Sequence, residues 1–431
     1  MFSVFKNAWK IQDLRKKIIF TLFIIVLFRI GSAIPVPFID AEAVKSIFNV
    51  GTGTDFLGYL NTLSGGALEK ATVFALSISP YITASIVIQL LTIAIPALER
   101  LSKEGEEGRK KLANWTRYTT IILGAITAFG YYTMLKNSNA LSKTNGTFES
   151  ILQAVVIIGI FITGACLIMW LGEKINEKGI GNGISIILFA GILSRFPAFI
   201  TQSITNITTG RAWIPVIGLI GGILMIAFVV IMNNAERRIP VQYAKRVVGR
   251  KVYGGQSTHI PMKVSMSGVM PIIFATSLIS MPSMIVALFY GNQVPTNGFW
   301  AGVMKIFSQT SWVYIVLVFL LIVAFSYFYV VIQFNPIEIS NNLKKNGGFI
   351  PGIRPGKSTT EYISKILWRI TFIGAMFLGI ISIVPNIVDM FAKVGLALGG
   401  TSLIIVVGVA IETVKQLESQ MLMRHYKGFL E

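Results

Sequence analysis

Residues 55–91 read DFLGYLNTLSGGALEKATVFALSISPYITASIVIQLL, a short amphipathic stretch followed by a long apolar run. Gly65 and Gly66 separate the two parts. About 10 helical residues rise only ~15 Å, whereas the hydrocarbon core of a bilayer is ~30 Å thick, so the first stretch cannot cross a membrane. The second part, residues 71–95, is long enough to do so. The pattern therefore predicts a half-length helix joined directly to a membrane-spanning helix.

The composition indicates a polytopic membrane protein. Of the 431 residues, 53% are hydrophobic and only 13% are charged, which is far from the composition of a soluble globular chain. Cys166 is the single cysteine, so an intramolecular disulfide is excluded, and it lies inside an apolar run. Basic residues precede the apolar run 18–34 as in a signal peptide, but Pro35, Pro37 and many further spans follow. We therefore expect an uncleaved first span.

Ten apolar runs are long enough to span, which predicts an all-α polytopic membrane protein. They fall at about 18–35, 71–95, 116–135, 151–171, 183–203, 213–232, 266–290, 311–333, 367–386 and 394–414. Five spans lie on either side of the connection 203–213. Because each half has an odd number of spans, the second half has the opposite orientation in the membrane to the first. We expect two inverted halves, residues 1–203 and 204–431, with a functional pathway between them.

The distribution of basic residues predicts that both termini are cytoplasmic. On the side of the termini lie 29 of the 38 lysines and arginines, and nine lie on the other side. Two cytoplasmic loops, 233–265 and 334–366, are much longer than a minimal connection. Their charge alone fits contact with anionic lipid headgroups equally well. The interleaved Tyr243, Phe349 and Ile350 favour folded projections that dock a large acidic or anionic partner.

The sequence contains no motif for catalysis, a cofactor or a metal. It has no phosphate-binding loop, no dinucleotide fingerprint and no His-Glu-x-x-His pair. The two histidines, His259 and His425, lie in different segments without cysteine neighbours, so we do not expect a metal site. Charged residues fall near the ends of the spans, which weakens an ion-coupled transporter but leaves open a Na⁺ site made of carbonyl groups.

Aliphatic residues at helical spacing occupy the centres of four spans, close to glycine or proline. Ile78 and Ile82 share one face of the second span, and Asn182 can cap a helix that begins the fifth. The other positions of this kind are Ile184, Leu188, Ile192, Ile273 and Ile405. Periodicity alone fits packing against neighbouring helices or lipid at least as well as a special role.

Several long stretches resemble the bacterial SecY family, which is part of the SecY and Sec61-alpha group. They include RIGSAIPVP, SGGALEKATVFALSISPYITASIVIQLL, EKGIGNGISIILFAGI, AKRVVGRKVYGGQSTHIPMKV, NPIEISNNLKKNGGFIPGIRPGKST and GGTSLIIVVG. The resemblance covers nearly the entire chain. It implies the large subunit of the general protein-translocation channel of the bacterial plasma membrane, with two pseudo-symmetric five-helix halves around an hourglass pore.

The resemblance also implies how the pore is closed. A ring of aliphatic side chains would form the constriction, at Ile78, Ile82, Ile184, Leu188, Ile273 and Ile405. A plug within residues 55–70 would close it from outside, carried by Asp55, Phe56, Leu57, Leu60, Leu63, Gly65 and Gly66. Asp55 could cap the plug helix and the two glycines could end it. Without the resemblance, an interfacial helix lying flat on the membrane fits this stretch as well.

A lateral exit into lipid is the second implied feature, between spans two and three on one side and seven and eight on the other. Its residues would be Thr83, Ser85, Gln89 and Met281. We expect the amide of Gln89 to find a partner across this gate, because an unpaired polar group in a membrane is costly. A permanent hydrogen bond between two helices is an alternative on the same physics.

The basic loops would then dock the SecA ATPase or the ribosome, which supply the energy that this chain lacks. The docking residues implied are Arg237, Arg238, Lys245, Arg246, Arg250, Lys251 and Arg354. Further implied partners are the small subunits SecE and SecG, signal peptides, unfolded preproteins and anionic lipids. The function expected is a passive, partner-driven channel rather than an enzyme. The alternatives are an ion-coupled secondary transporter of inverted-repeat type and, third, a scaffold for membrane assembly.

Overall fold

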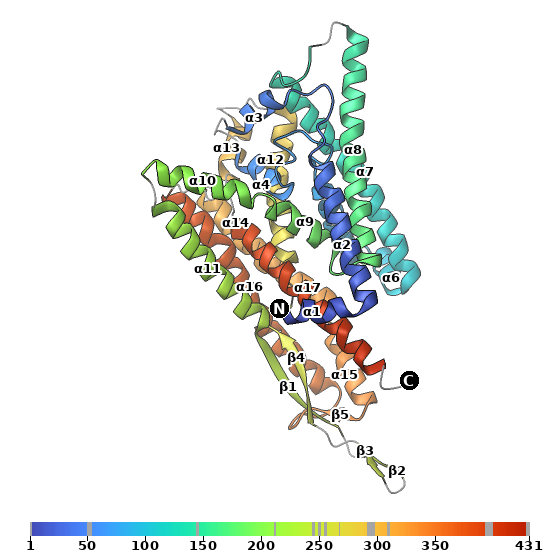
Figure 1. Ribbon diagram of the computed structural model, residues 1–431. Coiled ribbons are helices and arrows are strands. Elements are labelled where there is room, and N and C mark those ends of the chain that lie inside the picture. The colour runs from blue at the N-terminus through green and yellow to red at the C-terminus, as the bar shows by residue number, and fades with distance from the viewer. Residues whose placement is uncertain are drawn as a thin grey trace.

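The computed structural model describes residues 2–49, 54–143, 146–210, 213–243, 246–248, 251–253, 257–266, 268–290, 298–307, 311–392 and 400–427. Helices dominate this part of the chain (Figure 1). In the first part of the chain they are α1 (Phe2–Lys10), α2 (Gln12–Gly31), α3 (Ala41–Asn49), α4 (Thr54–Leu63), α5 (Ser79–Ala94), α6 (Pro96–Lys103), α7 (Glu106–Asn137), α8 (Thr147–Lys178), α9 (Gly183–Leu193) and α10 (Phe196–Thr208). They continue with α11 (Trp213–Asn234), α12 (Met270–Tyr290), α13 (Phe299–Ile306), α14 (Trp312–Gln333), α15 (Pro336–Lys345), α16 (Lys357–Ala392) and α17 (Gly400–Lys427).

The helical spans confirm the predicted membrane architecture. The ten expected spans correspond to α2, α5, α7, α8, the pair α9 and α10, α11, α12, α14, α16 and α17. By length and apolar composition alone, six helices in the described segments could cross a membrane, or seven if the bent pair α5 and α6 is one span. Many large apolar side chains on these helices are exposed, such as Ile220 and Leu224 on α11. Such faces suit contact with lipid, which makes the chain a multi-pass membrane protein.

Two spans differ from the prediction because the helix does not extend over the whole apolar run. The second span becomes helical only at Ser79, with Pro80 in its first turn, and residues 64–78 form turns. Their backbone is paired elsewhere: the Val36 amide donates to the Ala71 carbonyl, and the Val73 amide donates to the Ile34 carbonyl, both at 3.0 Å. The fifth span breaks after Leu193 and continues as α10, which has a proline in its first turn.

The half-length helix predicted before the second span is α4. It ends at Leu63, and Gly65 and Gly66 follow with φ of +68° and +86°, values that glycine adopts without strain. The predicted end of the helix is therefore confirmed. Asp55 lies inside the first turn of α4, and its side chain lies outside the described residues, so the predicted cap stays a prediction.

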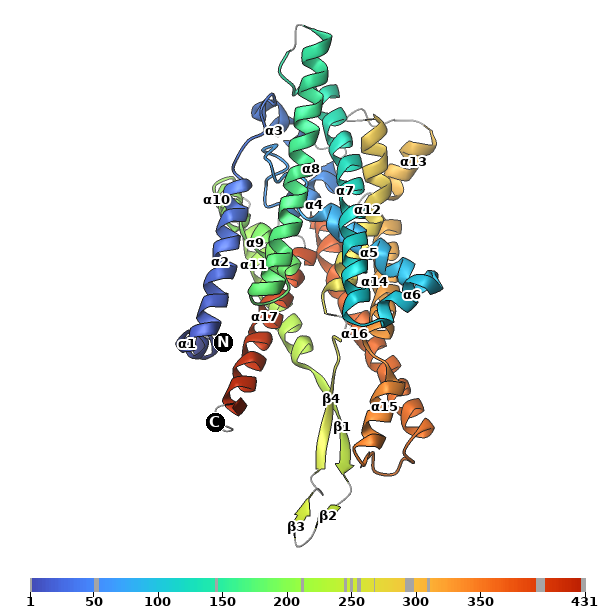
Figure 2. The same ribbon diagram turned by 90° about the vertical axis from the view of Figure 1, so that its right-hand side faces the viewer.

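The largest hydrophobic core joins helices from both parts of the chain. It contains buried residues of α2, α5, α8, α9, α12, α14, α16 and α17, together with Leu63 at the end of α4. The seventh span, α12, contacts α5 and α7 of the first part as well as its neighbour α14. Likewise α17 packs against both α9 and α11. The centre of the molecule is therefore a meeting point of helices far apart in sequence (Figure 2).

The two long basic loops fold, as predicted, but they fold partly as β-structure that the sequence analysis did not foresee. The strands are β1 (Glu236–Tyr243), β2 (Arg246–Val248), β3 (Lys251–Tyr253), β4 (Ser257–Lys263) and β5 (Gly348–Phe349). The first loop supplies β1 and β4, and the second loop adds β5, in the antiparallel order β4-β1-β5. A small core including Ile239, Val241 and Ile350 holds the two loops together. Both chain ends lie towards the same end of the molecule as this sheet (Figures 1 and 2).

We predict that Gly164→Ala destabilises the protein because α8 touches the turn segment there. A Cβ at position 164 would collide with the carbonyl of Val73, whereas one at Gly159 on the same helix meets nothing within 4 Å. Thermal unfolding of the detergent-purified protein should show a loss of about 1–3 kcal/mol for Gly164→Ala. Gly159→Ala should be neutral or stabilising by up to ~1 kcal/mol. Equal effects of the two variants would contradict the close contact.

Candidate functional site

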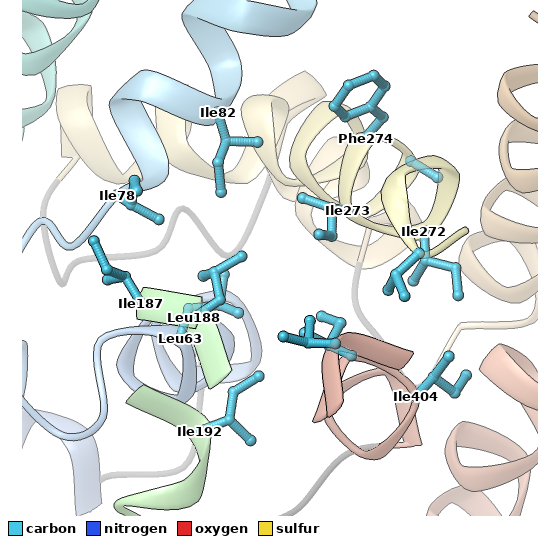
Figure 3. Close-up of a cluster of buried hydrophobic side chains, with 14 of the residues drawn as sticks. Leu63, Ile78, Ile82, Ile187, Leu188, Ile192, Ile272, Ile273, Phe274 and Ile404 are labelled. Atoms are coloured by element: carbon cyan, nitrogen blue, oxygen red, sulfur yellow. The ribbon is translucent and has the colours of Figure 1, made fainter. Parts of the chain in front are cut away.

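The six predicted ring residues lie in one hydrophobic cluster. Ile78, Ile82, Leu188, Ile273 and Ile405 are at most 4% exposed, and the partly buried Ile184 packs against the same cluster. They come from the start of α5, from α9, from the start of α12 and from α17. Figure 3 shows Ile82, Leu188 and Ile273 pointing toward one another from three different helices. The topology therefore brings together the positions that the resemblance singled out.

Helix α9 shows how this cluster is placed along the molecule. Its start is fixed by the predicted cap: the Asn182 side chain accepts hydrogen bonds from the amides of Ile184 and Ser185. Its other end contacts α4. Just beyond α4, the Gly65 carbonyl accepts a hydrogen bond from the Ser194 hydroxyl at 3.3 Å. Eleven residues span ~16 Å, so the cluster lies between the cap and the contact with α4.

A polar cavity of about 610 Å³ opens on the capped side of the cluster. The cap residue Asn182 and Ser185 line it at the start of α9. Gly408 and Glu412 line it from α17, three and seven residues after Ile405. Lys263 at the end of β4 and Gln333 at the end of α14 add further polar groups. The cavity therefore lies beside the β-sheet, and its lining also includes the aliphatic residues Val269 and Ile411.

The opposite side of the cluster is covered by the end of α4. Leu63 is 4% exposed and belongs to the same core as the ring residues. Its carbonyl accepts a hydrogen bond from the Ser77 hydroxyl at 3.4 Å. Leu60 packs against a second core formed with α3, α7 and α8. The side chains of Asp55, Phe56 and Leu57 lie outside the described part of the structure.

The predicted gate residues lie on the helices that were expected to form a gate. Thr83, Ser85 and Gln89 are half-buried on α5, and Met281 is half-buried on α12, which packs against α5 and α7. The Gln89 amide donates to the Ser85 hydroxyl on its own helix at 3.3 Å. The prediction that Gln89 has a partner across the gate is therefore wrong. A residue one turn away is a local alternative that removes the need for a distant partner.

The predicted docking residues are spread over the folded projection. Arg237, Arg238 and Arg354 are exposed, and the Arg238 guanidinium pairs with Glu236 at 2.7 Å. The Thr359 hydroxyl donates to the Arg354 carbonyl at 2.9 Å, which fixes the backbone of that loop. Arg246 and Lys251 lie on β2 and β3, which pair with each other, but their side chains are not described. Lys245 and Arg250 fall outside the described residues.

Within the described residues, no group of three or more His, Cys, Asp or Glu could hold a metal ion.

The structure also brings together polar residues that no sequence pattern singled out. Glu412 and Lys263 face one cavity from distant segments, and Arg195 pairs with Glu69 beside α4. Their positions near span ends were visible in the sequence. Their proximity was not, because it depends on long-range packing.

Comparison with known proteins identifies the family. A sequence profile of the SecY family matches residues 72–414. The chain belongs to the SecY family. Two similar relatives are the protein translocase subunits SecY of Streptomyces galbus and Thermotoga maritima, each 44% identical to this chain. The first match covers the whole of both chains, and the second covers all of this chain and 98% of its relative.

Solved structures share the SecY fold at lower sequence identity. A protein-conducting channel superposes with a TM-score of 0.68 at 20% identity, covering 94% of this chain and 92% of that one. A SecY structure that describes the plug domain gives 0.67 at 18% identity with the same coverage. Sec61 in a canine ribosome-channel complex gives 0.62 at 17% identity, again with this coverage. The likeness extends over nearly the whole chain.

Proposed function

We propose that this chain is the central subunit of a protein-conducting channel in the bacterial plasma membrane. It moves unfolded preproteins across the membrane and releases apolar segments sideways into lipid. The channel is passive, and SecA or the ribosome supplies the energy from the cytoplasmic side, where both termini also lie. SecE and SecG complete the complex. Membership of the SecY family and its translocase-subunit relatives support this role.

The observation that carries the proposal is the order of features along α9. A polar cavity lies at one end of this helix, the aliphatic cluster lies along it, and α4 touches its other end. This order suits a closed pore with a vestibule, a constriction and a plug. We assign the constriction to Ile78, Ile82, Ile184, Leu188, Ile273 and Ile405, and the plug to residues 55–70.

Hydrocarbon is a suitable material for this constriction. It offers ions no replacement for their hydration shell, so a narrow aliphatic passage loses its water and stays closed to them. It also offers a passing polypeptide no fixed hydrogen-bond partner, so segments of any composition can slide through. Branched side chains that change rotamer can close around the moving chain.

The packing of α12 supports a lateral gate. This helix belongs to the second half of the chain, yet it contacts α5 and α7 of the first half. Separation of α12 and α14 from α5 and α7 would open the pore toward lipid. The Gln89 hydrogen bond would survive this movement, because both of its partners lie on α5. Gate opening therefore leaves the amide paired.

We expect Ile405→Asn to make the resting channel permeable, because an amide at the constriction binds water and ions. Single-channel recordings of the purified complex without substrate should show a conductance at least several-fold above wild type. Ile82→Asn should act in the same way, and both should relax the demand for a good signal sequence in an export assay. Ile405→Val, which keeps the surface aliphatic, is the matched control. Wild-type recordings from both asparagine variants would remove these positions from the ring.

Arg354→Glu should abolish partner-driven export at normal channel abundance. Arg354 is exposed on a loop whose backbone is fixed by Thr359, so the charge can change without unfolding the loop. Lys357→Glu changes the same charge on an exposed residue three positions away and should have a much smaller effect. SecA-driven translocation into vesicles measures both. Equal rates for wild type and Arg354→Glu would count against the docking assignment.

A halted preprotein distinguishes the channel from the ion-coupled transporter. A polypeptide stalled midway should crosslink to photoreactive groups placed at Ile82 on α5 and Ile273 on α12. The same groups at Ile220 on α11, an exposed position away from the cluster, should give no product. A transporter would instead show saturable, gradient-driven uptake of a small solute and no crosslink to the stalled chain.

A further inference from the structure

Polar side chains converge on the last turn of α4. Asn61 and Thr62 are only 3% and 8% exposed, so their polar atoms need partners within the protein. The Asn61 amide donates to the Glu69 carboxylate at 3.0 Å, and the Glu69 backbone amide donates to the Asn61 side chain at 3.1 Å. The Arg195 guanidinium donates to the Thr62 hydroxyl at 3.2 Å. Two neighbouring residues of α4 are therefore each held by a charged side chain.

The two charged side chains also pair with each other. Arg195 Nη2 lies 3.5 Å from Glu69 Oε2, and the two side chains are 22% and 24% exposed. The same carboxylate oxygen accepts from Asn61. Arg195 stands at the junction of α9 and α10, and Glu69 belongs to the turn segment after α4. An ion pair therefore connects two parts of the fold that flank α4.

Each of these parts is also held by contacts that do not involve α4. Around Glu69, the Tyr131 hydroxyl of α7 donates to the Leu68 carbonyl at 2.6 Å, and the Ala71 carbonyl is paired with Val36. Leu68 and Ala71 are at most 2% exposed. Arg195 follows directly on α9, which packs against α8 and α17. Gly65 and Gly66, with positive φ, separate α4 from the anchored turn segment.

We propose that Arg195 and Glu69 form a polar socket that holds α4 in its sealing position by binding Thr62 and Asn61. The inference rests on the proposed function, with α4 as the moving part of the plug and Glu69 in the anchored part of residues 55–70, beyond Gly65 and Gly66. When α4 swings out about the two glycines, Arg195 and Glu69 keep each other as partners. Release therefore leaves no unpaired charge in a partly buried site, which would be costly. The socket stays formed and receives α4 again when translocation ends.

Removal of one polar contact should loosen the seal while the pore itself still works. Thr62→Val deletes the hydroxyl that Arg195 binds at almost constant volume, and Arg195→Met deletes the donor. In planar bilayers without substrate, both variants should raise the resting conductance of the purified complex at least several-fold. Preprotein translocation should be retained. The matched control is Thr127→Val on α7, whose hydroxyl bonds within its own helix at the Leu123 carbonyl.

A charge swap separates the socket from simple packing. In the double variant Arg195→Glu with Glu69→Arg, the ion pair is reversed, yet the hydroxyl of Thr62 and the amide of Asn61 can each donate or accept. The swap should therefore restore a resting conductance near wild type, whereas each single charge reversal should leak. A swap that leaks as much as the single reversals would overturn the socket.

Deletion of residues 57–66 provides the reference for a channel without a plug. A leaky deletion together with wild-type conductance in Thr62→Val and Arg195→Met would overturn the socket and leave the plug assignment standing. A deletion that does not leak would overturn the plug assignment itself. If Arg195→Met fails to assemble, Thr62→Val and Asn61→Leu decide, because they alter α4 alone.

Discussion

The contact of branched aliphatic side chains from α5, α9, α12 and α17 is the interaction on which the rest of this structure depends. Ile82, Leu188, Ile273 and Ile405 meet there from parts of the chain that are far apart in sequence. Each is almost fully buried, so the helices that carry them cannot separate without exposing hydrocarbon or letting lipid or water enter. The polar cavity and α4 take their positions from the two ends of this contact.

Gln89 and Arg195 each have a partner that does not oppose the proposed opening. In the proposed movement, the Gln89 amide keeps Ser85 on its own helix, and Arg195 keeps Glu69 when α4 departs. Departure of α4 also breaks its hydrogen bonds to Arg195 and Glu69, whereas movement at the proposed gate mainly exchanges apolar contacts. Such contacts are not directional, and they can form again with the side chains of a passing polypeptide or with lipid. A channel that accepts many sequences needs this property.

The sequence predicted the helices better than it predicted their ends and partners. Composition located the spans, Asn182 was recognised as a cap, and Gly65 and Gly66 as the end of α4. Residues 71–78 are as apolar as a span, yet their backbone pairs with residues 34–36, a contact that no local pattern reveals. The proximity of Arg195 to Glu69, and the joining of β5 to β1, likewise follow from tertiary packing. Periodicity alone could not distinguish a pore ring from ordinary packing, so the proposed ring rests on the family resemblance.

The shared sheet of the two projections has a mechanical consequence. Strand β1 follows α11 almost directly and β4 leads towards α12, while β5 lies between α14 and α16. The hydrogen bonds between β1 and β5 therefore connect the ends of four spans through one stiff element. The strands therefore form a hydrogen-bonded route from the loop of Arg354 to the start of α12. In the proposed channel, force from outside the bilayer can thus act on α12, the helix assigned to the lateral gate.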